Sequence, residues 1–160
     1  MAETEAARLK ERIYSTITML AVVVALADTE SASRWDAAAV VIATAAGLWL
    51  ATLVADDQAH RAVHGRGADR RERLRMLYVS SPLMLSAVGP LVMTALSALG
   101  ALSLDSALLI SAGAGVVSLF GWGYAGGRRM GAHPATAVVG GVLDTVIGVA
   151  VVAIKLVAQH

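Results

Sequence analysis

The chain contains no cysteine, which excludes a disulfide scaffold, a thiolate metal site and a cysteine nucleophile but leaves the cellular compartment open. Charged residues are also scarce. They make up 16% of the 160 residues, whereas an average soluble domain carries about 25%. The formal net charge is only +1. Because RNA-binding, zinc-finger and P-loop motifs are missing as well, the sequence predicts no nucleic-acid partner.

Signatures of catalysis are missing too. The sequence has neither a GxSxG nor a HExxH motif. The sequence offers no inward-facing carboxylate pair beyond Asp56 and Asp57, and these two are adjacent and so diverge on a helix. We therefore predict that the protein is not an enzyme.

Apolar residues are abundant: they make up 57% of the chain, and the mean hydropathy is +0.67. One small core cannot hide so many from water, so the sequence predicts an all-α polytopic membrane protein in a single domain, 1–160. A helix that crosses a bilayer needs roughly 20 apolar residues. Five stretches approach or reach this length, at residues 13–27, 37–55, 79–104, 106–126 and 134–154.

Lys and Arg are distributed unevenly between the ends of these spans. Of the 13 such residues, three precede residue 13, six lie between residues 56 and 78, and two lie in the turn at 127–133. This positive-inside pattern predicts a cytoplasmic N-terminus, an external C-terminus and a place in the cell (inner) membrane. Residues 1–27 resemble a signal peptide, but their glutamates balance their basic residues, so we expect a retained first helix.

The third span contains Gly89 and Pro90, and the proline predicts a kink there because it has no N–H and its ring clashes with the preceding turn. Such a break can expose backbone carbonyls to ions in a transporter, or it can be an ordinary feature of a membrane helix. Met19, Met84 and Met93 are candidates for soft thioether ligands of a transition metal or for core filling.

The fifth span contains one acid, Asp144, near its middle. An aspartate at that depth costs about 2.5–3.5 kcal/mol on insertion scales. Helical steps of three and four residues place it on a stripe of mostly small residues, which allow another helix to approach closely. The stripe consists of His133, Ala137, Gly140, Asp144, Gly148, Val151 and Lys155. We expect Asp144 to face the bundle or a dimer seam, as an ion or proton site or as a hydrogen-bonded structural acid.

The polar segment 56–78 is predicted to continue the second helix into the cytoplasm, to turn at Gly65 and Gly67, and to return as a helix. Asp57, His60 and His64 share one face of that helix and form a candidate site for a divalent metal ion. The alternative is a solvated helical extension. Six arginines in the same segment are candidates for binding anionic lipid headgroups, at about 1 kcal/mol each. These are Arg61, Arg66, Arg70, Arg71, Arg73 and Arg75.

The order of these features resembles the vacuolar iron transporter (VIT) family. The resemblance rests on residues 118–152, SLFGWGYAGGRRMGAHPATAVVGGVLDTVIGVAVV, and on residues 84–93, MLSAVGPLVM. It implies five membrane helices in a homodimer that exchanges Fe(II) or Mn(II), with ion-path acids in the first helices. Here the first span has no acid, so none of the family's metal ligands corresponds by position to a residue of this chain.

The leading functional prediction is a small membrane transporter of a divalent metal cation, with Asp144 as the intramembrane acid and a bound divalent metal ion as its possible cofactor. The alternative is a scaffold or partner-binding subunit that does not transport and that binds lipid through the arginines of residues 61–75.

Overall fold

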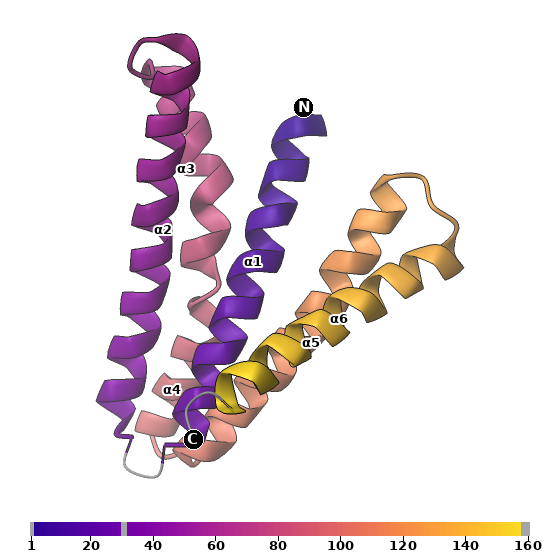
Figure 1. The fold of residues 1–160 in the computed structure, drawn as a ribbon. Coiled ribbons are helices and arrows are strands. Elements are labelled where there is room, and N and C mark those ends of the chain that lie inside the picture. Colours follow the sequence, from indigo (N-terminus) through magenta and orange to yellow (C-terminus); the bar gives the residue numbers. More distant parts are fainter. Residues whose placement is uncertain (1, 30–31, 158–160) are drawn as a thin grey trace.

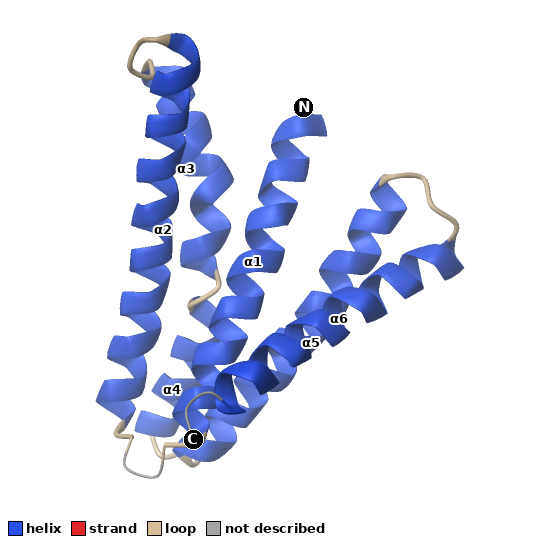
Figure 2. Ribbon diagram, viewed as in Figure 1, coloured by secondary structure: helices blue, strands red, loops and turns tan. Residues whose placement is uncertain are grey.

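The computed structural model describes residues 2–29 and 32–157, and within these ranges it consists of six helices and no strand (Figures 1 and 2). The all-α prediction is therefore confirmed. The helices are α1 Ala2–Ala27, α2 Arg34–His64, α3 Arg70–Leu85, α4 Val88–Ala98, α5 Leu104–Arg129 and α6 Pro134–Val157. The side chain of Lys155, counted above on the Asp144 stripe, lies outside the described part.

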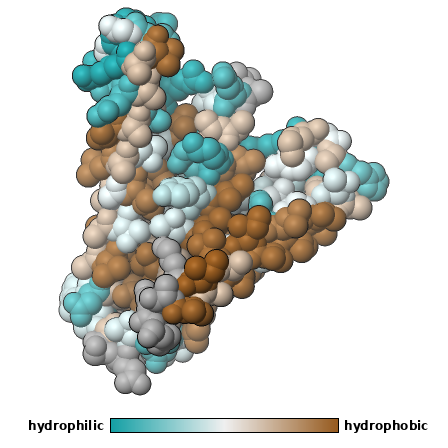
Figure 3. Space-filling model, viewed as in Figure 1, coloured by the Kyte–Doolittle hydropathy of each residue, from teal (hydrophilic) through white to brown (hydrophobic). Residues whose placement is uncertain are grey.

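Four segments are long and apolar enough to cross a membrane: α2, α3 and α4 together over Arg70–Ala98, α5, and α6 up to Ile154. Only 17–33% of the apolar window of each is buried inside the molecule. Brown apolar surface accordingly covers much of the face shown in Figure 3. Such an exposed apolar surface fits a bilayer and would be unfavourable in water.

Two capping boxes fix where α2 and α3 begin. The Ser33 hydroxyl accepts a hydrogen bond from the Asp36 backbone N–H, and the Asp36 carboxylate accepts one from the Ser33 N–H. Asp69 and Glu72 form the same reciprocal pair at α3. Each box satisfies donors that a helix start leaves free. Gly65 ends α2 in the left-handed conformation, with φ at 65°.

The regular helical hydrogen bonding of the third span is interrupted just before its proline, although Ser86 and Ala87 keep right-handed helical backbone angles. α3 ends at Leu85, Ser86 and Ala87 form a turn, and α4 starts at Val88. Pro90 is thus in the first turn of α4, where a missing N–H leaves no intrahelical bond unmade. A continuous helix would have needed that N–H to bond the Ser86 carbonyl, so the interruption falls just upstream of Gly89 and Pro90.

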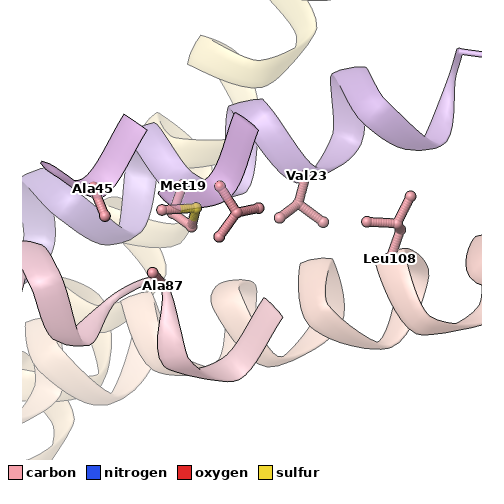
Figure 4. Packing of buried hydrophobic residues seen from close by; sticks show 6 residues of the cluster. Met19, Val23, Ala45, Ala87 and Leu108 are labelled. Carbon is pink, nitrogen blue, oxygen red and sulfur yellow. The ribbon is translucent and has the colours of Figure 1, made fainter. Parts of the chain in front are cut away.

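Helix α1 lies in the middle of the bundle and contacts α2, α3, α5 and α6. The start of α1, the α2–α3 connection and the α5–α6 turn lie towards one end of the molecule in Figure 1, and the end of α6 lies towards the other. Buried apolar residues of α1, α2 and α5 meet Ala87 of the α3–α4 turn in the core shown in Figure 4. This cluster consists of Met19, Val23, Val41, Ala45, Ala87 and Leu108.

Candidate functional site

A cavity of about 410 Å³ lies between α1, the α3–α4 break and α5. Its lining runs from Arg12 of α1 and Trp122 of α5 at one end of the cavity to Val23 further along α1. Both sides of the break contribute, with Ser86 from the turn and Pro90 from α4. Most of the lining surface is apolar, which is typical of ligand sites in proteins.

The α3–α4 break gives the cavity one unusual backbone feature. The Ser86 carbonyl would accept a hydrogen bond from the N–H of residue 90 in a continuous helix, but residue 90 is proline. Ser86 and Pro90 both line the cavity. At mid-membrane depth, interrupted backbone is tolerated where it is buried in protein or lines such a cavity.

The hydroxyl groups that line the cavity all donate to backbone carbonyls, so they have no proton left for a ligand. The bonds are Ser15 and Thr16 to the Arg12 carbonyl (3.1 and 2.7 Å), Ser86 to Leu83 (2.7 Å), Ser111 to Ala107 (2.8 Å) and Ser118 to Ala114 (2.7 Å). Such back-bonding is common for Ser and Thr within helices. The wall therefore behaves as a weakly polar surface that offers acceptors rather than donors.

Arg12 is the one ionisable residue in the lining, and no carboxylate contributes to it. Its guanidinium lies over the Trp122 ring, with 4.4 Å between the Cζ atom and the ring centroid. In the described part of the chain it makes no ion pair. A cation held on an aromatic face without a counter-ion gives this end of the cavity a positive potential.

Asp144 lies at the seam between α5 and α6 and does not line the cavity. Its Oδ2 is so close to Gly123 that a Cβ there would lie 2.6 Å from it. The carboxylate is half-buried and has no hydrogen bond or ion pair within residues 2–29 and 32–157. The prediction that its stripe packs on another helix is confirmed, because Ala137, Gly140 and Gly148 also contact α5. Its role as an ion or proton site stays a prediction.

The α5–α6 seam is close because glycines let the two backbones touch. A Cβ on Gly123 would lie 2.8 Å from the Cα of Gly141, and one on Gly127 would lie 2.9 Å from the Cα of Ala137. The Gly123/Gly127 pair thus supports the close helix contact expected of small residues four apart.

Asp57, His60 and His64 share a helix face, but their side chains have other partners. Asp57 pairs with Arg61 at 2.7 Å. The two imidazoles stack at 4.3 Å, and His64 Nδ1 lies 3.1 Å from the His60 carbonyl oxygen. In the part of the chain that the structure describes, no three His, Asp or Glu residues are grouped to hold a metal ion. The structure therefore does not bring these three together as a metal site.

Glu72 organises the α2–α3 connection instead. Its carboxylate accepts two hydrogen bonds from Arg66, at 2.8 and 3.0 Å, and one from the Asp69 backbone. His60 Nε2 lies 3.5 Å away. Hydrogen bonds from Arg66, then from the backbone, lower the pKa of Glu72 to about 2. Charge-assisted hydrogen bonds to Glu72 therefore hold the α2–α3 connection together.

The six arginines of this segment fall into two groups of three. Arg61, Arg66 and Arg75 pair with Asp57, Glu72 and Glu3, the last at 3.9 Å. Arg70, Arg71 and Arg73 are exposed and make no ion pair in the described ranges. Only the second group has its full charge available to an external anion.

Sequence reasoning missed the roles of Arg12 and Trp122. In the sequence, Arg12 counted only as one of the basic residues that predict the orientation in the membrane. One further signal was present, because Arg12 immediately precedes the uncharged run of the first span and lies one turn before two hydroxyl residues. Its position opposite Trp122 depends on how α1 packs on α5, which no local pattern encodes.

No family model, curated protein or solved structure matches this chain.

Proposed function

We propose that this chain is a small integral membrane transporter with five membrane-crossing segments, a cytoplasmic N-terminus and the α1–α3–α4–α5 cavity as its substrate chamber. The observation that carries the proposal is the interrupted span α3–α4, whose broken ends line a cavity inside the bundle. Transporters commonly bind substrate at such discontinuous helices near the bilayer midplane. The resemblance of residues 118–152 to the VIT family supports the same class.

Helix α1 is the fifth crossing segment in this proposal. Its uncharged part, residues 13–27, is about 22 Å long at 1.5 Å per residue, which is shorter than a hydrocarbon core of about 30 Å. Long basic side chains at Arg8, Lys10 and Arg12 can extend to the headgroups and make up the difference. Its central place among the other helices also reduces its contact with lipid.

The substrate expected from the sequence is a divalent cation. Met19 and Met93 both line the chamber and could offer thioether sulfurs, and Asp144 is the intramembrane acid. Two features of the chamber disfavour a bare cation: its lining contains no carboxylate, and Arg12 gives it a positive charge. We therefore test an anionic substrate as well as divalent cations.

The test is uptake into liposomes that contain the purified protein, with and without a pH gradient. The substrates are Fe(II), Mn(II), Zn(II), Co(II) and dodecyl phosphate. Ala114→Phe, which places a ring in the chamber, should reduce uptake at least tenfold, whereas Ala150→Phe on the exposed side of α6 should leave it unchanged. Asp144→Asn should abolish uptake of a cation coupled to protons. Folded wild-type protein that moves none of these substrates would contradict the proposal.

We also propose that the protein is a homodimer. Asp144 lies against α5 but stays partly exposed and has no partner in the described chain, and the exposed part of such a carboxylate is costly wherever lipid reaches it. A second copy packed beside Asp144 would remove it from lipid. The mass of the detergent-solubilised protein tests this, and a monomer in several mild detergents would contradict it.

A second candidate function is a membrane scaffold that binds lipid headgroups. The observation that favours it is the exposed, unpaired state of Arg70, Arg71 and Arg73. Three such charges near an anionic surface contribute about 3 kcal/mol. Binding of anionic vesicles by variants that lack these charges tests it.

A further inference from the structure

We propose that the ligand of the chamber is an amphipathic anion with one long alkyl chain, whose head binds at Arg12 and whose chain lies along the apolar wall. This ligand class deepens the proposed function and rests on it for the role of the chamber.

The head site is at the Arg12 end of the chamber. A guanidinium carries five N–H donors, and none of them is engaged by a carboxylate in the described residues. The Trp122 ring supports the guanidinium from one face and thereby restricts its orientation. An anionic head would therefore find a positioned donor that gains charge-assisted hydrogen bonds without breaking an existing ion pair.

The depth of this head site matches the membrane interface. Arg12 directly precedes the uncharged residues 13–27 of α1, and Trp122 is an aromatic residue of the kind that gathers at headgroup level. An anionic head at Arg12 would thus remain at the interface, while the rest of the molecule extended inward along the chamber.

The wall beyond Arg12 suits an alkyl chain rather than a polar substrate. It is lined by Leu20, Val23, Leu85 and Ile110. Its hydroxyl groups have already donated their protons to backbone carbonyls, so a polar ligand would find no hydroxyl donor there. Arg12 and Val23, both in the lining, are about 16 Å apart along the α1 axis at 1.5 Å per residue. A site of this length accommodates a long chain.

The combination of head and wall distinguishes this ligand from simpler ones. A small inorganic anion would gain Arg12 but leave the apolar length of the chamber unfilled. A neutral alkyl chain would pack against the apolar wall of the chamber but leave the Arg12 guanidinium without a counter-ion. A molecule with both parts satisfies both, because burial of each methylene contributes about 0.8 kcal/mol in addition to the charge interaction.

Equilibrium binding of radiolabelled dodecyl phosphate to the full chain in nanodiscs of zwitterionic lipid tests the proposal. Inorganic phosphate serves as the head alone and dodecanol as the chain alone. We expect saturable binding that each of these displaces at least tenfold less effectively than unlabelled dodecyl phosphate. Displacement by inorganic phosphate at equal concentration would overturn the proposal in favour of a site for a free anion.

Variants locate the site. Arg12→Gln should weaken binding about tenfold, Arg12→Lys should retain most of it, and Ala114→Phe should abolish it. The matched controls are Arg128→Gln, which removes a charge at the same end of the molecule but outside the chamber, and Ala150→Phe. Equal losses in Arg12→Gln and Arg128→Gln, or no saturable binding by folded wild-type protein, would overturn the proposal.

The ligand class and the transport function can be contradicted independently, because binding and uptake are separate measurements. Saturable binding that depends on Arg12, without uptake into liposomes, would support the ligand class and contradict the transporter. Uptake of a divalent cation that is blocked by Ala114→Phe, in protein that does not bind dodecyl phosphate, would support the transporter and overturn the ligand class.

Discussion

Gly123 is one of the residues at which the backbones of α5 and α6 approach each other closely. A methyl group there would lie within 3 Å of atoms of Asp144, Gly140 and Gly141. Two of these contacts are to backbone, which cannot rotate away as a side chain can. Without a hydrophobic drive between helices in lipid, such close packing is a main source of their association.

We expect Gly123→Ala to destabilise the protein by about 1–3 kcal/mol, the usual cost of an overpacked contact. Gly121 provides the matched control, because a Cβ at that position of α5 meets no atom within 4 Å. Gly121→Ala should stabilise the protein by about 0.5–1 kcal/mol through the helix propensity of alanine. Denaturant unfolding followed by circular dichroism compares them. Equal effects of the two variants would show that the seam is looser than described.

At the scale of elements, the start of α3 depends on one carboxylate. Glu72 accepts hydrogen bonds from Arg66 and from the Asp69 backbone, so it holds both the helix start and the connection to α2. Protonation of this group would remove the ion pair with Arg66 and weaken the capping hydrogen bond from the Asp69 N–H, because a neutral carboxyl oxygen is a weaker acceptor.

The pKa of Glu72 is lowered from 4.5 to about 2, so its contribution is fully present above pH 4.5 and is lost as the pH falls towards 2. We expect amide exchange in the first turn of α3 to accelerate over this window, beyond the intrinsic pH dependence of exchange. Glu72→Gln should show that faster exchange already at pH 7. In the control, Asp36→Asn at the start of α2, exchange in α3 should match the wild type. An unchanged α3 in Glu72→Gln would contradict this assignment.

The α3–α4 break lies in the single span for which the sequence predicts a kink at Pro90, and it begins a few residues before that proline. Local pattern identified Pro90 as the cause, since the missing N–H and the ring clash are properties of that residue alone. The turn at Ser86 and Ala87, by contrast, depends on Ala87 packing into the core beside Met19 and Leu108. Such long-range contacts are not visible in a local pattern.

At the scale of the whole molecule, charge is divided between internal pairing and free surface. Arg61, Arg66 and Arg75 neutralise carboxylates of the chain, and Arg70, Arg71 and Arg73 do not. The segment therefore has fewer free charges than its composition suggests.

We expect the triple change of Arg70, Arg71 and Arg73 to glutamine to weaken attraction to anionic lipid by about 3 kcal/mol, or roughly 100-fold. The matched control replaces Arg61, Arg66 and Arg75 with glutamine. It removes the same formal charge, but these arginines bind carboxylates of the chain rather than lipid phosphates, so only the long-range part of the attraction should be lost. Nanodiscs that contain the protein and zwitterionic lipid, titrated with anionic vesicles, measure both. Equal losses would mean that net charge alone governs binding.

The sequence by itself determined the helical class, the apolar segments and the small-residue stripe around Asp144, because each follows from composition or from helical periodicity within one segment. It also located the proline that interrupts the third span. The tertiary structure alone decided that Arg12 lies against Trp122 and that Asp144 faces α5 outside the cavity. These facts depend on which helix faces packed together, and residues as far apart in the sequence as Arg12 and Trp122 have no shared local pattern.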